Sequence, residues 1–409
     1  MNVLLKGTPL SPGRAIGRLR KVRNREDAKT VTDEEIVFGE SLLPPIPAFA
    51  KKARGFILCG SGTDHGAAYV REAWIPSVLV KKLPRLKEGE LVTLDGTAGR
   101  VLTGRQGQEK RGREMLKEDV KAKIYLQMGL PFLAERAAQL KTDGIGLARM
   151  NLLVEETGKH PYYHFIRKGK EEELSEVIAK GIEKLARAFS PKPVWVRTLD
   201  FSTDELSLYE GGDLEQKEGN PLLGWRGIAR DLGQPALLEA EYRAVHTLIK
   251  KGVSNIGILF PMLRDVSEFR LAKARMKKCG MEPHKDIKVG VMIETPSSAL
   301  TTGAFILEGL DYVFIGINDL TQYTLATDRA NPRMRKLYNP ASRAVLTLVY
   351  RVIEECKKSG VEVTMSYQSP LKKHIPELLR KGLSGFVLHA DAINEVGRVI
   401  AEYEAKNPF

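Results

Sequence analysis

The chain has 409 residues, with 64 Lys and Arg against 51 Asp and Glu, and a formal net charge of +13 at pH 7. This length predicts two or three domains rather than one small core, and a hydrophobic content of 43% is ordinary for a globular protein. No apolar run reaches the length of a membrane span, and no signal-peptide core opens the chain. Three widely spaced cysteines match neither a zinc site nor a disulfide framework. We therefore expect a cytoplasmic protein without a membrane association.

Residues 1–104 form the first predicted domain, because short β-rich runs there are separated by Gly and Pro. The expected strands are 16–22, 55–58, 77–80, 91–94 and 100–102. Between them, GSGTDHGAAYVRE at 60–72 places His65 where a glycine-rich turn enters an alanine-rich helix. A helix N-terminus favours phosphate, and a nucleophilic imidazole there can carry a phosphoryl group. An unreactive surface or core histidine is the other interpretation.

Two further regions follow. Residues 105–125 are polar and highly charged, and we expect a solvent-exposed linker helix without chemistry of its own. Residues 126–409 alternate short apolar strands with amphipathic helices such as 235–251, 267–279 and 342–360. This alternation favours an α/β fold of the (β/α)8 TIM-barrel type, although only seven strands are recognisable, and a doubly wound open sheet is the alternative. The seven strands are GIGLAR, PVWVRTLD, NIGILFPM, KVGVMIETP, DYVFIGINDL, VEVTMSY and SGFVLHA.

Polar side chains lie at, or just after, the C-terminal ends of these strands, where a parallel barrel builds its active site. They are Arg149, Arg197, Glu294, Asn318, Asp319 and Ser366. Planar guanidinium groups, which bind phosphate and carboxylate bidentately, come from Arg149, Arg197, Arg226 and Arg329. Two carboxylates, Glu294 and Asp319, together with substrate oxygens suit Mg²⁺. One such Arg alone indicates a structural ion pair, but the whole set favours a site for a small phosphate ester.

The same stretches resemble the C-terminal half of the phosphoenolpyruvate-utilising enzymes, such as phosphoenolpyruvate synthase, pyruvate phosphate dikinase and enzyme I of the sugar phosphotransferase system. The matching motifs are GIGLAR, VRTLD, NPLLGWRGI, FPM, GVMIETPSSA, FIGINDLTQYTLATDR and LYNPA. Upstream, LLKGTPLSPGRAIG and GTDHGAA…IPSVLV…GELVTLDGTAGRV resemble the mobile phosphohistidine domain of the family. The resemblance covers nearly the whole chain. It implies a small, swivelling α/β phosphohistidine domain before a TIM-type barrel.

The resemblance also implies roles for individual residues. His65 matches the phosphorylated histidine of a phosphotransferase that uses phosphoenolpyruvate or pyruvate. Glu294 and Asp319 match the ligands of an Mg²⁺ cofactor, and Asn318 matches a neighbouring phosphate contact. The arginines implied to hold phosphoenolpyruvate are Arg149, Arg197, Arg226 and Arg329. We expect a separate ATP-binding or phosphocarrier protein as the second phosphoryl partner, since no such domain precedes residue 1, and a homodimer formed through the barrel.

Three positions depart from the family pattern. Ser366 stands where the family has the Cys that protonates C3 of enolpyruvate, and an alkanol is a far weaker acid than a thiol. Asp64 replaces a Ser or Cys beside the phospho-acceptor, where its charge repels phosphate or orients the imidazole, and Asn151 replaces a glutamate. Cys356 lies in an expected helix and is not expected to substitute. A non-catalytic phosphoenolpyruvate-binding regulatory or scaffold paralogue is therefore the alternative function, and no motif supports nucleic acid as a partner.

Overall fold

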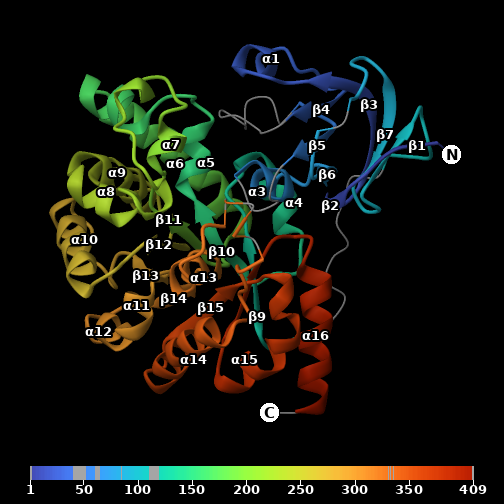
Figure 1. The fold of residues 1–409 in the computed structure, drawn as a ribbon. Helices are drawn as coiled ribbons and strands as arrows, with labels where there is room; N and C mark the ends of the chain where they lie inside the picture. The colour runs from blue at the N-terminus through green and yellow to red at the C-terminus, as the bar shows by residue number, and fades with distance from the viewer. Residues whose placement is uncertain are drawn as a thin grey trace. The chain divides into compact units, whose positions relative to one another are not determined.

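The structure is a computed structural model, and it describes residues 2–39, 52–59, 65–83, 85–109, 119–329, 331, 333–334 and 336–407. The chain divides into two compact units (Figure 1). The first comprises residues 1–114, 155–158 and 389–391, and the second comprises residues 115–154, 159–388 and 392–409. Among the described segments, none of the helices combines the length and the apolar character that crossing a bilayer requires.

The first unit is built on a mixed eight-stranded sheet in the order β1-β8-β7-β3-β4-β5-β6-β2. Its strands are β1 (Val3–Lys6), β2 (Thr8–Ser11), β3 (Arg14–Lys21), β4 (Glu35–Gly39), β5 (Gly55–Cys59), β6 (Ser77–Val80), β7 (Leu91–Asp95) and β8 (Arg100–Thr103). The pairs β3–β4, β4–β5 and β5–β6 are parallel, and the others are antiparallel. Ile36 and Phe38, at alternate positions of β4, pack with Ile57 and Val78 in its core.

All five strands expected in this region are present, each within two residues of its expected ends. The pattern does not reveal β1, β2, β4 or helix α1 (Arg25–Lys29), and β4 is missed because only residues 36–38 mark it as apolar. The helix expected at His65 is α3 (His65–Glu72), of which His65 is the first residue. The His65 side chain and Asp64 lie outside the described residues.

The second unit holds a closed barrel of eight parallel strands, which confirms the (β/α)8 prediction and excludes the doubly wound sheet. In Figure 1 its strands run from green to red inside a ring of helices. The strands are β9 (Lys123–Gln127), β10 (Gly144–Arg149), β11 (Val194–Arg197), β12 (Ile256–Phe260), β13 (Lys288–Ile293), β14 (Tyr312–Ile315), β15 (Glu362–Ser366) and β16 (Gly385–Leu388).

β9 is the eighth strand, which the sequence pattern does not reveal. The linker helix expected over residues 105–125 is wrong in the parts that the structure describes, because residues 105–109 and 119–122 are irregular and residues 123–125 belong to β9. Only Ile124, Tyr125 and Leu126 of this strand are buried, too short a run to stand out beside a charged segment. Pairing with both β10 and β16 nevertheless makes β9 the strand that closes the barrel.

The helices expected at 235–251, 267–279 and 342–360 are present as α9, α10 and α14. Each presents an apolar face inward; in α14 this face includes Val345, Val349, Val352 and Cys356. The helices of the second unit are α4 (Ala134–Ala138), α5 (Met150–Glu155), α6 (Glu171–Phe189), α7 (Thr203–Leu206), α8 (Ile228–Gly233), α9 (Pro235–Lys250), α10 (Val266–Lys278), α11 (Pro296–Leu300), α12 (Thr302–Leu307), α13 (Ile317–Thr324), α14 (Arg343–Lys358), α15 (Ile375–Lys381) and α16 (Ile393–Lys406), with short η1 (Pro131–Leu133), η2 (Pro161–Phe165), η3 (Ile166–Lys168), η4 (Gly212–Leu214), η5 (Pro221–Leu223) and η6 (Ser369–His374).

Aromatic rings fill the inside of the barrel. Trp195 stacks on Tyr312, with ring centroids 4.4 Å apart, and Tyr125 meets Tyr312 edge-on at 6.2 Å. Gly257 on the neighbouring strand makes room for the indole, because a Cβ at this position would lie 2.4 Å from the Trp195 ring. The barrel is therefore a packed core, and polar chemistry is confined to its ends.

Candidate functional site

Asp200, which the sequence analysis does not single out, joins two of the predicted arginines. It follows the end of β11 by three residues and is buried. Its Oδ1 and Oδ2 accept hydrogen bonds from Nε and Nη2 of Arg226, at 2.8 and 2.6 Å. Nη1 of Arg197 lies 3.2 Å from the same Oδ2. One carboxylate thus orients two guanidinium groups at the C-terminal end of the barrel strands.

Arg197 is the last residue of β11 and only 8% exposed. Its Nη2 donates to Oδ1 of Asn151 at 2.8 Å, and the backbone N–H of Asp200 donates to the same oxygen at 3.1 Å. Burial lowers the pKa of Arg197, the charges of Asp200 and Glu294 oppose this effect, and the charge of Arg149 adds to it. The charges of these three groups therefore act on Arg197. Asn151 connects the ends of β10 and β11.

Arg197, Asp200 and Arg226 form a row of alternating charges, and Asp319 extends it. It is the third residue of α13, and its carboxylate lies 3.3 Å from both Nη1 and Nη2 of Arg329. Nη1 of Arg226 lies 3.6 Å from Oδ1 of Asp319. The charged side chains thus form a continuous row of contacts in the order Arg197, Asp200, Arg226, Asp319, Arg329. The predicted convergence of these arginines is therefore present in the fold.

Glu294 lies directly after β13 and is 3% exposed. Its Oε2 accepts a hydrogen bond from the N–H of Met262 at 2.9 Å. Met262 has a left-handed φ of 56°, a conformation that costs a non-glycine residue about 1–3 kcal/mol and is common at functional sites. Gly316 leaves room for the carboxyl group, because a Cβ there would lie 2.6 Å from Oε1 of Glu294. Burial, and then the charges of Asp319 and Asp200, raise the pKa of Glu294 to about 8.

The residues Glu294 and Asp319 fit a divalent cation. Neighbouring buried carboxylates raise each other's charging cost, and a bound cation removes that cost. Within the described part of the chain, no group of three or more His, Cys, Asp or Glu is arranged to hold a metal ion. The protein thus offers two hard oxygen donors, which suits Mg²⁺ because this ion commonly completes its shell with water and substrate phosphate.

Asn318 is the second residue of α13, and Ser366 is the last residue of β15. Oδ1 of Asn318 accepts hydrogen bonds from Nε2 of Gln368 at 2.6 Å and from the Tyr338 hydroxyl at 3.3 Å. The hydroxyl of Ser366 accepts from the N–H of Ile317 at 3.2 Å and donates to the carbonyl of Ile315 at 3.4 Å. The Ser366 hydroxyl therefore contacts the backbone on both sides of Gly316, where β14 leads into α13, the helix that carries Asn318.

Cys356 does not take the place of the missing cysteine. Its side chain is fully buried in the apolar face of α14, where burial raises the pKa of the thiol to about 12. The thiol is therefore a packing group of this helix rather than a proton donor.

The structure brings five of the predicted residues into the contacts described above, and it places Asn318 at the start of α13 and Ser366 at the end of β15. Arg149 ends β10, and its charge acts on Arg197. His65 belongs to the first unit. The contributors that sequence reasoning missed are Asp200, Gln368 and Tyr338. A signal exists for Asp200, because it ends the motif VWVRTLD three residues after Arg197.

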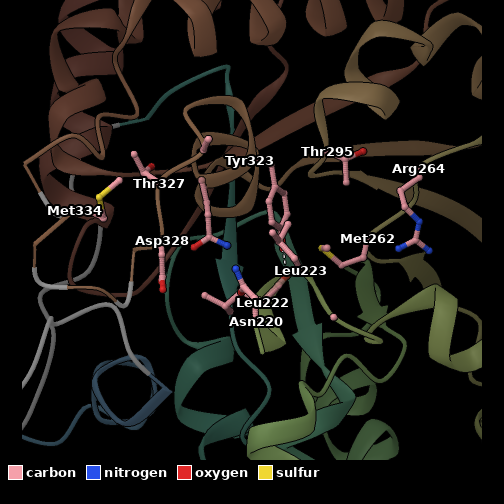
Figure 2. A pocket seen from close by; sticks show the side chains of 13 residues that line it. Asn220, Leu222, Leu223, Met262, Arg264, Thr295, Tyr323, Thr327, Asp328 and Met334 are labelled. Carbon is pink, nitrogen blue, oxygen red and sulfur yellow. Dashed lines mark hydrogen bonds between the residues drawn. The ribbon is translucent and has the colours of Figure 1, made fainter. Parts of the chain in front are cut away.

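A cavity of about 490 Å³ adjoins the elements that hold the site. Figure 2 shows Tyr323 of α13 reaching toward residues 220–223, where its hydroxyl donates to the carbonyl of Leu222. Met262, which donates to Glu294, lines the cavity, and so does Gln322, whose Oε1 accepts from the N–H of Arg329 at 3.1 Å. None of the predicted site residues whose side chains the structure describes lines it. The cavity thus shares its walls with the site but is not the arginine cluster itself.

Comparison with known proteins shows the family. Residues 104–405 match the family described as PEP-utilising enzyme, PEP-binding domain, and the chain belongs to it. Phosphoenolpyruvate synthase of Pyrococcus furiosus is 39% identical over 99% of this chain and 51% of that protein. Probable phosphoenolpyruvate synthases of Archaeoglobus fulgidus (35%; 99% of this chain, 54% of that protein) and Methanocaldococcus jannaschii (40%; 84% and 30%) are also similar. The chain spans about half the length of the first two of these relatives.

Proposed function

We propose that this chain is a phosphoenolpyruvate-dependent phosphotransferase that moves a phosphoryl group between phosphoenolpyruvate and His65. The observation that carries the proposal is the continuous row from Arg197 through Asp200, Arg226 and Asp319 to Arg329, with Glu294 beside it. Family membership and the printed names of the relatives support phosphoenolpyruvate as the substrate.

The arginines bind the phosphate and carboxylate groups of the substrate, because each guanidinium presents paired donors at a fixed geometry. Asp200 and Asp319 hold these donors in place before the substrate arrives, which lowers the entropy cost of binding. Glu294 and Asp319 hold Mg²⁺, which when bound neutralises charge on the phosphoryl oxygens. Asn318 contributes an amide contact at the same end of the barrel.

The transfer breaks the bond between phosphorus and the enol oxygen and forms a bond between phosphorus and an imidazole nitrogen of His65. The electron pair of the broken bond remains on the oxygen, so pyruvate leaves as its enolate. The arginines stabilise this negative charge, since positioning and charge neutralisation dominate phosphoryl transfer. A proton added at C3 then completes pyruvate, and Ser366 is a weak donor for this second step.

The remaining parts of the proposal concern partners. The first unit acts as a mobile phosphohistidine domain, a separate ATP-binding or phosphocarrier protein exchanges the phosphoryl group with His65, and two barrels associate as a homodimer. The match of nearly the whole chain, both units included, to phosphoenolpyruvate synthases supports a joint role of the first unit and the barrel.

The test is labelling of the full chain with phosphoenolpyruvate that carries radioactive phosphorus, in the presence of Mg²⁺. We expect acid-labile label on the wild type and on His246→Ala, a control histidine in α9, but none on His65→Ala. Equal label on His65→Ala would assign the acceptor role to another residue. Calorimetric binding of phosphoenolpyruvate without any label would instead support the non-catalytic paralogue, and absence of both would overturn the proposal.

A further inference from the structure

Arg197 and Arg226 enter the row of charges from different kinds of backbone. Arg197 is the last residue of β11, and the backbone that follows it is held by Glu241 of α9, whose Oε2 accepts a hydrogen bond from the N–H of Leu199 at 2.9 Å. Arg226 instead lies in the irregular segment between η5 and α8. Side chains from outside this segment therefore have to fix the backbone that presents Arg226.

Arg230 of α8 holds the residue that precedes Arg226. Its Nε donates a hydrogen bond to the carbonyl of Trp225 at 3.0 Å. Its guanidinium carbon also lies over the Trp225 ring, 4.5 Å from the ring centroid. Because the Trp225 carbonyl belongs to the peptide group that joins Trp225 to Arg226, Arg230 fixes the backbone directly before the substrate-binding arginine.

The Arg230 guanidinium is itself held in one orientation. Its Nη1 and Nη2 donate to Oε1 and Oε2 of Glu215 at 2.7 and 3.1 Å, and both side chains are only 4% exposed. Glu215 is fixed in turn by His160. Nδ1 of His160 accepts from the N–H groups of Tyr162 and Tyr163, so its Nε2 carries the proton of the neutral ring and donates to Oε1 of Glu215 at 3.0 Å.

Two further side chains anchor the same segment. Oε1 of Glu218 accepts from the N–H of Trp225 at 2.9 Å, and its Oε2 accepts from the hydroxyl of Thr203 in α7 at 2.8 Å. Tyr323 of α13 donates to the carbonyl of Leu222 (Figure 2). Both backbone polar groups of Trp225 are thus bonded to charged side chains, the N–H to Glu218 and the carbonyl to Arg230.

We propose that Arg230 and Glu218 are positioning residues for phosphoenolpyruvate, which act by holding the two sides of Trp225 and hence the backbone of Arg226. With this backbone fixed, the Arg226 guanidinium keeps its place in the row before the substrate arrives, so binding costs less conformational entropy. Every guanidinium nitrogen of Arg230 already has a partner in the protein, so Arg230 acts through Arg226 rather than as a ligand. The inference rests on the proposed function, because it requires Arg226 to bind the substrate.

Two substitutions release the two sides of Trp225 separately. Arg230→Lys keeps a positive charge beside Glu215 but loses the planar fork and the Nε donor to the Trp225 carbonyl. Glu218→Ala releases the N–H of Trp225 and removes only a half-buried side chain, so it keeps the proposal testable if Arg230→Lys does not fold.

Arg275→Lys is the matched control. Arg275 lies in α10, and its Nη1 pairs with Glu239 of α9. The substitution therefore alters an arginine–glutamate pair of the same unit without touching residues 218–230.

Amide hydrogen exchange of the full chain, measured by mass spectrometry on peptides that cover residues 218–229, tests the anchors without any ligand. We expect Arg230→Lys and Glu218→Ala each to raise the exchange rate in these peptides by about tenfold, because the segment opens more often. Arg275→Lys should match the wild type. Exchange at the wild-type rate in both variants would overturn the proposal.

The initial rate at which radioactive phosphoenolpyruvate labels the full chain, at low substrate concentration, shows whether the anchors act through Arg226. We expect Arg230→Lys and Glu218→Ala each to lower this rate by about tenfold, and Arg275→Lys to leave it unchanged. In a chain that already carries Arg226→Lys, the same two substitutions should lower the rate by less than about twofold, because they act on a side chain that is already altered. Equal factors in both backgrounds would indicate a merely structural role and overturn the proposal.

Failure of the proposed function is distinguishable from failure of this inference. A wild type that acquires no label contradicts the proposed function, while hydrogen exchange still decides whether Arg230 and Glu218 hold the segment. Labelling at the wild-type rate in both variants, together with faster exchange, would overturn the link between these anchors and the substrate.

Discussion

Asp200 and Arg226 form a two-point ion pair, with 2.8 Å between Oδ1 and Nε and 2.6 Å between Oδ2 and Nη2, and both side chains are buried. The same carboxylate also lies 3.2 Å from Arg197. A single carboxylate therefore contacts two buried guanidinium groups that lie almost thirty residues apart in the chain, Arg197 at the end of β11 and Arg226 just before α8. Removing its charge leaves both arginines without their main partner.

Asp200→Asn should accordingly lower the free energy of unfolding by about 3–5 kcal/mol, the usual cost of breaking a buried ion pair. Urea denaturation followed by circular dichroism measures this change. Glu183→Gln is the control, since Glu183 pairs with Arg187 on the surface of α6 and should have no measurable effect. Similar effects of the two substitutions would show that Asp200 is not the central partner of the arginine row.

Glu294→Gln and Asp319→Asn should each abolish the stabilisation of the protein by Mg²⁺. A ligand present at one hundred times its dissociation constant stabilises the folded state by about 2.7 kcal/mol, and differential scanning calorimetry with and without Mg²⁺ detects this difference. Glu282→Gln, which removes an exposed partner of Lys277, should leave the response intact. An unchanged response in both site variants would place Mg²⁺ elsewhere.

His160 should make the second unit lose stability in mild acid. Its Nδ1 accepts from the N–H groups of Tyr162 and Tyr163, both at 3.1 Å, and its Nε2 lies 3.0 Å from Glu215. Burial lowers the pKa of His160 below its ordinary 6.5, although Glu215 opposes the effect. The contribution of His160 is therefore complete above pH 6.5 and is lost as the pH falls, because the unfolded chain binds the proton first.

The slope from this one proton approaches about 1.4 kcal/mol per pH unit. Urea titrations at a series of pH values measure it, and His160→Asn should remove it while lowering stability at neutral pH by about 1–3 kcal/mol through the lost hydrogen bonds. An identical slope in the variant and the wild type would contradict this prediction.

Ser366 should limit the handling of pyruvate but not phosphoryl transfer. Its hydroxyl is engaged with the backbone of Ile315 and Ile317 and is a weak acid, so proton exchange at C3 of pyruvate should be undetectable in the wild type. Ser366→Cys should raise the exchange by about two orders of magnitude or more, as a positioned general acid does, and NMR in D₂O measures it. Ser369→Cys is the control. Rapid exchange in the wild type would mean that another residue donates the proton.

The strands of the barrel were predictable where both of their faces are covered. β10 to β16 are short apolar runs, as expected for a parallel sheet with helices outside and a packed core inside. β9 has Lys123 and Gln127 at its ends and follows a charged segment, so only three apolar residues mark it, and one of its two partner strands, β16, lies about 260 residues later in the chain. A partner this distant leaves no local pattern in the sequence.

The residues of the site also divide into those that the sequence predicts and those that it does not. Arg197, Glu294 and Asp319 were predictable because strand ends meet at one edge of a barrel. The role of Asp200 was not, since it depends on Arg226, which reaches it only in the folded chain. Glu241 resembles a solvent-exposed residue of a charged helix. Its spacing of four residues from Leu237 and from Val245 nevertheless puts it on the buried face of α9. This spacing predicts that Glu241 is buried, although its charge suggests exposure.

The pairing of β9 with β16 also has a consequence for how the protein is made. The ribosome releases β9 first among the barrel strands and β16 last, so one edge of β9 and one edge of β15 stay unpaired until residues 385–388 emerge. Open edges of this kind pair readily with other chains. A nascent chain that stalls before residue 385 therefore exposes two unpaired strand edges at once, and both can pair with other chains. Synthesis of the four residues of β16 allows the barrel to close and removes both unpaired strand edges.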